Sequence, residues 1–190
     1  VMNGFRSELI NKIVGFNSHA VVKPYSKNIE IKLENNVMMA FYSNDGEAVI
    51  INKNNTKGVL LKGYLENDFK RLEIANNNEF LGSNNLIDNS ISIGRELSLN
   101  LNLNIGDNII LMSPSGVQTI VGSLPKHELF KVISIFDSGL SDYNENVAYI
   151  NLTSLENFFD KESGLRFIEY YFINPQQIED HKIALENLYQ

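Results

Sequence analysis

Residues 113–130, SPSGVQTIVGSLPKHELF, constrain the fold of this chain more than any other stretch. Two prolines, Pro114 and Pro125, bracket ten residues without a charge, and apolar runs lie on either side at 109–112 and 129–133. Two strands joined by a long uncharged loop or hairpin account for this pattern. Because proline has no N–H for a sheet ladder, we expect the bracketed segment to leave the body of the domain.

An apolar projection on an acidic protein favours binding in a partner's groove over a catalytic centre. The alternative is that the apolar side chains of the segment pack beneath the domain's own loops. With 21% charged residues, a charge-free window of ten arises by chance with a probability of roughly 0.1. The missing charge alone therefore does not decide between the two interpretations. The apolar residues in question are Val117, Ile120, Val121 and Leu124.

Composition excludes several classes of protein. A chain of 190 residues with 43% hydrophobic residues can bury a core and could form one domain or two small subdomains. The net charge of −7 argues against nucleic acid or anionic lipid as the main partner. No apolar window is long enough to span a bilayer. The chain begins at Val1 without a signal-peptide pattern, so we expect it to be a piece of a longer protein. The absence of cysteine excludes disulfides and thiolate metal sites.

The first half of the chain predicts one helix followed by short strands. Met2, Phe5, Leu9 and Ile13 have helical spacing. Strands are expected at 19–22, 29–33 and 59–65. A hairpin is expected at Asn44-Asp45-Gly46, between strands 37–42 and 48–52, because Asp-Gly adopts positive φ readily.

The second half predicts a mixture of strands and helices. The leucine-rich segment 91–103 favours a helix by its length, although its alternation also suits a strand. Strands are expected at 131–136, 147–150 and 166–173. Thr153 with Glu156 resembles a capping box, and Asn174 with Pro175 is typical of a helix start. The predicted class is α+β with mainly antiparallel pairing.

No pattern in the sequence indicates catalysis or a bound cofactor. His19, His127 and His181 are scattered, so a metal site is not expected. The chain has no glycine-rich nucleotide loop, and Ser115 has no sequence context that would activate it as a nucleophile.

Three carboxylates lie close together in sequence, at Asp137, Asp142 and Glu145. A carboxylate pair could act as acid and base, but carboxylates in a turn after a strand are more often solvated or capping groups. We therefore predict a non-catalytic protein with no cofactor.

Several segments together resemble one family. Each is short, and their order and spacing make the resemblance specific. The segments are Val1-Met2-Asn3-Gly4-Phe5-Arg6 with Glu8-Leu9, Ile93-Gly94-Arg95-Glu96-Leu97, Gly106-Asp107, Pro114 with Pro125, Phe130-Lys131-Val132, Phe136-x-Ser138-Gly139-Leu140, Asp142-Tyr143, residues 147–152 and Asn174-Pro175. With these segments the chain resembles the LolC/LolE family of lipoprotein-releasing permeases, over nearly its whole length and only loosely in 37–90.

The resemblance implies the periplasmic domain between the first and second transmembrane helices of an inner-membrane ABC permease. It implies a MacB-like periplasmic core domain of α+β class, with a protruding β-hairpin. A porter-like α/β part would comprise about 1–37 and 91–190, and an inserted strand-rich part about 38–90. The implied partners are a separate LolD-type ATPase, a partner permease subunit, the lipoprotein cargo and the periplasmic chaperone LolA.

In that family a proline-bracketed hairpin, the hook, engages LolA. Carried over to this chain, the hook comprises Pro114, Ser115, Gly116, Val117, Gln118, Thr119, Ile120, Val121, Gly122, Ser123, Leu124 and Pro125.

A polar patch beside the hook, the pad, corresponds to Lys126 and His127, with Glu128 and Ile110 at positions where basic residues are typical of the family. The sequence does not distinguish a LolC-type, a LolE-type or a hybrid subunit. A MacB-like or FtsX-like extracellular domain that docks another envelope partner is the alternative.

Overall fold

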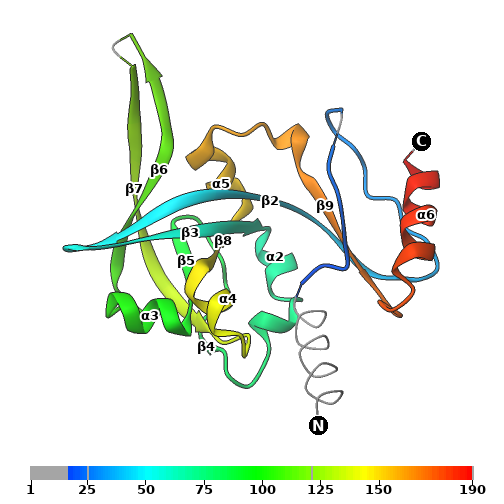
Figure 1. The fold of residues 1–190 in the computed structure, drawn as a ribbon, viewed down its shortest axis with the longest axis horizontal. Coiled ribbons are helices and arrows are strands. Elements are labelled where there is room, and N and C mark those ends of the chain that lie inside the picture. Colours follow the sequence, from blue (N-terminus) through cyan, green and yellow to red (C-terminus); the bar gives the residue numbers. More distant parts are fainter. Residues whose placement is uncertain (1–16, 25, 121, 190) are drawn as a thin grey trace. The chain divides into compact units, whose positions relative to one another are not determined.

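The computed structural model describes residues 17–24, 26–120 and 122–189, so the helix predicted near the N-terminus lies outside the described residues. The chain forms two compact units, Val1–Ser43 with Gly164–Gln190, and Asn44–Ser163. Strand β2 (Val37–Asn52) begins in the first unit and ends in the second (Figure 1). These boundaries differ from the porter-like and inserted parts implied by the family resemblance, and that assignment stays a prediction.

The first unit is a small antiparallel sheet that packs against one helix. Strand β9 (Phe167–Phe172) lies between β1 (Ala20–Val22) and the start of β2. Helix α6 (Ile178–Leu188) packs through the ring of His181, which stacks on Phe172 with 4.0 Å between ring centroids. The core of this unit consists of Ile168, Tyr170, Phe172 and Leu185 with partly buried neighbours.

Helix α6 begins at Ile178, later than the start predicted at Asn174-Pro175, which is therefore wrong. The carbonyl of Asn174 accepts the N–H of Gln177 in a turn and lies 2.8 Å from Nε2 of His181. These contacts hold Asn174 in a turn that precedes the helix.

The strand predicted at 29–33 is also absent from the structure. Side-chain hydroxyls bind this backbone in place of a neighbouring strand. The hydroxyl of Tyr189 donates to the carbonyl of Glu30, and that of Tyr170 donates to the carbonyl of Lys32, at 3.1 and 2.8 Å. Since these carbonyls already have partners, the apolar residues of the segment can face the core without joining a sheet.

The second unit is built on six strands that pair in a closed ring. From the end of β2 the order of pairing is β3, β8, β5, β7 and β6, and β6 pairs back onto β2. We call these six strands the strand ring. Two of the pairings, β3 with β8 and β5 with β7, are parallel. The pairs β1–β9, β2–β9, β2–β6, β5–β8 and β6–β7 are antiparallel, so the expectation of mainly antiparallel pairing is correct. The bounds are β3 (Asn55–Tyr64), β5 (Ser90–Gly94), β6 (Asn108–Thr119), β7 (Gly122–Phe136) and β8 (Val147–Asn151).

Each strand of the ring contributes two alternate residues to one core, as the period of two in a strand requires. Leu155 and Phe158 from helix α5 (Leu152–Phe159) add to this core. So do Leu97 and Leu101 from helix α3 (Arg95–Leu101), and Leu103 just after it. The alternate residues are Ala48 and Ile50, Val59 and Leu61, Ile91 and Ile93, Ile109 and Leu111, Phe130 and Val132, and Ala148 and Ile150.

The remaining elements are α2 (Glu66–Phe69), η1 (Glu73–Ala75), β4 (Leu81–Gly82), α3 (Arg95–Leu101), α4 (Ser141–Asn146) and η2 (Ser163–Leu165). The mixture of helices and strands confirms the α+β class.

The hairpin predicted at Asn44-Asp45-Gly46 is wrong, because β2 runs through these residues without a turn. The chain reverses later, at Lys53, whose φ is 56°. Asn44 is buried, and its side-chain oxygen accepts a hydrogen bond from Lys161 Nζ at 3.0 Å. Gly46 serves close packing, since a Cβ there would lie 2.6 Å from the ring of Phe159.

Segment 91–103 divides into strand β5 and helix α3, so its prediction as one helix is wrong in the first part. Gly94 lies at the junction, where a Cβ would come within 1.9 Å of the carbonyl oxygen of Asn144. Helix α5 is capped by Asn151, whose side chain accepts the N–H of Thr153 at 2.9 Å. Thr153 is therefore inside the helix, and the predicted capping box is wrong.

A cluster of hydrogen bonds lies just after the end of β7. We call it the polar joint, and it consists of Asp137, Ser138, Gly139, Asn144 and Arg95. The Asp137 carboxylate accepts hydrogen bonds from the Gly139 N–H, the Asn144 amide and Arg95, at 2.8, 2.8 and 2.9 Å. The Oδ1 of Asn144 accepts from Ser138 Oγ at 2.7 Å. Burial raises the pKa of Asp137, but the hydrogen bonds from Gly139, Arg95 and Asn144 outweigh it and leave the pKa below its ordinary value.

We predict that Gly46→Ala destabilises the chain by about 1–3 kcal/mol, because the added methyl group overlaps the Phe159 ring. Gly58→Ala in β3 is the matched control, since a Cβ there has no heavy atom within 4 Å. Urea unfolding measures both. In the double variant Gly46→Ala/Phe159→Ala, the alanine at 46 should add little further cost. A full additional cost in that background would contradict the packing explanation.

We predict that the stabilising effect of Asp137 is lost in acid. The folded-state pKa is lowered, so the unfolded chain binds the proton more tightly. The contribution is complete above the unfolded pKa of about 4 and disappears as the pH falls through the lower folded value. The free energy of unfolding, measured at pH 7, 5 and 3 beside Asp137→Asn, should show a difference that shrinks below about pH 4. A difference independent of pH would contradict this assignment.

Candidate functional site

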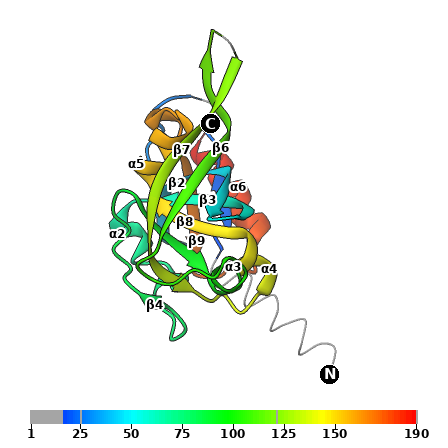
Figure 2. The same cartoon turned by 90° about the vertical axis from the view of Figure 1, so that its left-hand side faces the viewer.

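Strands β6 and β7 form one long hairpin whose base belongs to the strand ring. Ile109 and Leu111 on β6 and Phe130 and Val132 on β7 are buried in the core of the ring. The same two strands continue past this core and project beyond the other elements of the second unit, as Figures 1 and 2 show from two directions. The sequence prediction of a projecting hairpin is correct.

Both prolines lie within the strands, beside an irregularity in the ladder. Between the pairs Ser113–Lys126 and Val117–Leu124 the chain advances four residues on β6 but only two on β7. This bulge contains Gly116 at a φ of 53°, where a Cβ would lie 2.1 Å from the carbonyl oxygen of Leu124. The missing proline N–H groups therefore fall where pairing is already interrupted, and the ladder resumes beyond them.

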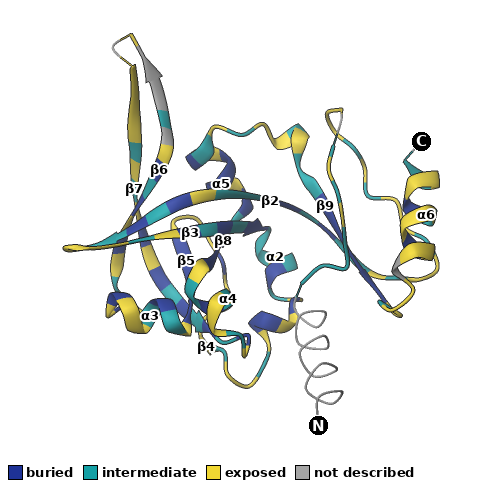
Figure 3. Ribbon diagram, in the orientation of Figure 1, coloured by how far each residue is buried: buried dark blue, intermediate teal, exposed yellow. Residues whose placement is uncertain are grey.

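The end of the hairpin is exposed to solvent (Figure 3). The relative accessibility of Ile120 is 106% and that of Leu124 is 58%. Pro114 and Pro125 are exposed as well. These positions are not packed beneath the domain's own loops, so that alternative is wrong for them. The side chains of Ser115, Val117, Gln118, Thr119 and Val121 lie outside what the structure describes.

The residues assigned to the pad have different surroundings. Lys126 Nζ lies 3.1 Å from a carboxylate oxygen of Glu128 and donates to the carbonyl of Asn157 in α5, at 2.5 Å. His127 is exposed. Because successive residues of a strand point to opposite faces, Lys126 and His127 do not share one face of β7. Ile110 is 39% exposed. The charge of Lys126 is largely balanced by Glu128.

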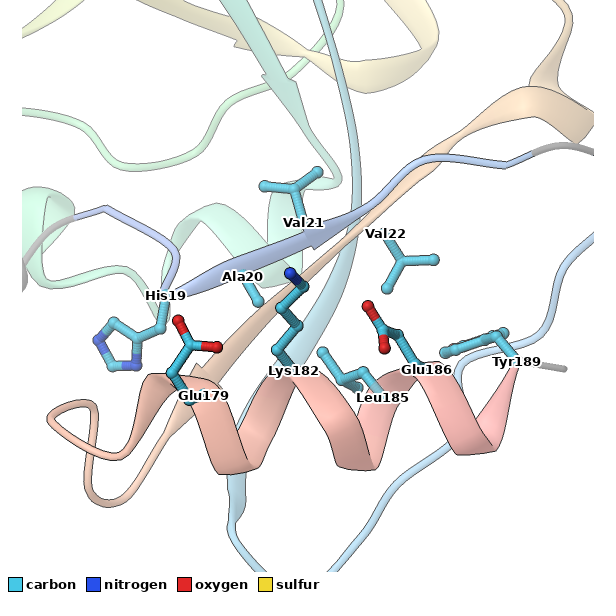
Figure 4. A pocket seen from close by; sticks show the side chains of 9 residues that line it. All are labelled: His19, Ala20, Val21, Val22, Glu179, Lys182, Leu185, Glu186 and Tyr189. Carbon is cyan, nitrogen blue, oxygen red and sulfur yellow. The ribbon is translucent and has the colours of Figure 1, made fainter.

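A groove of about 660 Å³ lies in the first unit between β1 and α6 (Figure 4). Ala20, Val22 and Leu185 provide apolar side chains to it, and Lys182 and Glu186 project from the helix. His19 beside it accepts the N–H of Phe172 through Nδ1 at 2.8 Å, so this histidine has a structural role. Nothing in this arrangement indicates a reaction.

The carboxylates that lie close in sequence do not form an acid–base pair. Asp137 belongs to the polar joint, whereas Glu145 binds Lys57 Nζ at 2.8 Å. The backbone carbonyl of Asp142 accepts from the side chain of Asn146. Among the described residues there is no group of three acidic, histidine or cysteine side chains suited to a metal ion. Within the described ranges, no helix is long and apolar enough to cross a membrane.

The sequence of this chain is similar to those of known proteins. No protein-family model matches the chain. It is 21% identical over 179 residues to the lipoprotein-releasing system transmembrane protein LolC of Xylella fastidiosa, covering 87% of the chain and 43% of that protein. To LolC of Buchnera aphidicola subsp. Schizaphis graminum it is 26% identical over 197 residues, covering 98% and 46%. The chain thus spans about half the length of these curated relatives.

The chain is also similar to solved structures. The periplasmic region of MacB from Actinobacillus actinomycetemcomitans has a TM-score of 0.48 at 14% identity, over 82% of this chain and 69% of that one. The extracellular domain of the noncanonic ABC-type transporter YknZ has a TM-score of 0.48 at 14% identity, over 77% and 71%. Similarity to LolC proteins along most of the chain confirms the resemblance to lipoprotein-releasing permeases that its motifs indicate.

Proposed function

We propose that this chain is a non-catalytic periplasmic domain of an inner-membrane ABC permease that releases lipoproteins. The hook recruits the periplasmic carrier LolA, which then receives the lipoprotein. In the whole protein, a LolD-type ATPase and a partner permease subunit supply and transmit the energy. The observation that carries the proposal is the exposed hairpin end with Ile120 at its tip.

The chemistry of the hook suits a partner's apolar groove. Residues 114–125 carry no charge, so their burial removes no ion from water. The hairpin is rooted in a packed core, and two prolines restrict its backbone before binding. Both features reduce the conformational entropy that is lost when a partner binds.

The expected affinity is modest. Burying Ile120 and Leu124 contributes about 1.5–3 kcal/mol each, or roughly 3–6 kcal/mol together. Loss of translational and rotational freedom costs about 4 kcal/mol or more. These two side chains alone therefore give little net affinity, and further contacts are needed for a micromolar complex. A carrier that must leave with its cargo requires a complex that dissociates readily.

We predict that Ile120→Asp weakens binding of purified LolA to this chain at least about tenfold, because it removes the apolar contact and buries a charge. Calorimetry measures the affinity. Leu99→Asp is the matched control, since Leu99 on α3 is also exposed, at 68%. Equal thermal unfolding of the two variants and the wild type would show that folding is intact.

Unchanged affinity of Ile120→Asp would overturn the assignment of the hook. A well-folded wild-type chain that does not bind LolA would favour a MacB-like or FtsX-like domain that docks another envelope protein.

A further inference from the structure

A shallow depression of about 390 Å³ lies on the outer face of the strand ring, over β2 and β3. Its apolar lining residues include Val49, Leu60 and Pro114, and Gly58 also borders it. Glu47 and Asn146 are its polar lining residues.

The depression follows from the alternation of the two strands. Ala48 and Ile50 on β2, like Val59 and Leu61 on β3, are core residues of the strand ring. The positions between them face outward. An outward face of a solvated strand is usually polar, but here it carries Val49 on β2 and Leu60 on β3. Gly58, two residues before Leu60 on β3, has no side chain that would fill the space beside them. A Cβ at Gly58 would have no heavy atom within 4 Å.

The depression is continuous with the hook. Pro114 is the first residue of the hook and also lines the depression. Val49 pairs with Met112, two residues before Pro114, so the two surfaces are adjacent across the β2–β6 ladder. A protein that covers the hook from this side reaches the depression without a gap.

The hook by itself is smaller than a standard specific interface. Stable interfaces involve about 20–30 residues and about 800 Å² on each partner. Residues 114–125 are fewer than this, even if all of them touch the partner. A surface next to the hook can supply the rest, and the depression is apolar and shares Pro114 with the hook.

We propose that this depression is a second docking subsite for the same carrier that takes the hook, an inference that rests on the proposed function. It accepts an apolar side chain of the carrier between Val49, Leu60 and Pro114. The carboxylate of Glu47 at its edge fits a basic or hydrogen-bond-donating group beside that side chain. The hook and the depression together then set the orientation of the carrier.

Filling the depression tests the proposal without disturbing the fold. Gly58→Phe places a ring in open space, and its φ lies outside the left-handed region, so the variant should fold. We expect it to weaken LolA binding at least about tenfold in calorimetry, while Gly58→Ala leaves the affinity within about twofold. Leu60→Ser should also weaken binding, in contrast to Leu99→Ser on α3, which is exposed but outside the surface.

Parallel measurement of Ile120→Asp separates the two proposals. If Ile120→Asp loses binding but Gly58→Phe and Leu60→Ser bind as the wild type does, the subsite is wrong and the hook stands. If the wild-type chain binds no LolA, both are wrong. If the chain alone self-associates and Gly58→Phe abolishes this in sedimentation, a second copy occupies the depression, and the subsite is again wrong.

Discussion

Strand β6 hydrogen-bonds to β2 along one edge and to β7 along the other, and in doing so it closes the strand ring. Closure gives each of these six strands two neighbours within the ring and brings their alternate apolar residues into one interior. The hook is the continuation of β6 and β7 beyond this interior. Its direction therefore depends on the packing of Ile109, Leu111, Phe130 and Val132 at its base. A binding element that grows out of a packed core presents its tip with little freedom to lose.

Some of the residues that carry the family resemblance lie in the polar joint. Gly94 lies against the carbonyl of Asn144, Arg95 binds Asp137, and Ser138 binds the Asn144 side chain. These contacts connect the end of β5 to the turn after β7. Gly94, Arg95 and Ser138 therefore have structural roles in this chain. The proposed docking chemistry depends on residues outside this joint, at the hairpin tip and on the outer face of β2 and β3.

Charge has a small part in the proposed interface. The hook carries none, and the positive charge of Lys126 is balanced by Glu128 3.1 Å away. Apolar contact gives affinity without directional demands, whereas a desolvated ion pair must be matched with precision in its geometry. An interface of this kind depends on shape: a projecting hairpin, and an open depression beside it that Gly58 keeps clear.

The sequence by itself determined the elements whose apolar pattern is local: strands near 59–65, 131–136 and 147–150, and a projecting hairpin marked by two prolines and an uncharged segment. Tertiary structure decided the rest, because the same local signal served different purposes. Asn44-Asp45-Gly46 has the composition of a turn, yet Phe159 needs the space at Gly46 and Lys161 binds Asn44, so the strand continues. Segment 29–33 has a strand pattern, but the hydroxyls of Tyr170 and Tyr189 bind its carbonyls in place of a neighbouring strand. The closure of the ring and the depression on its outer face require strands far apart in the chain to meet, and no local pattern specifies that register.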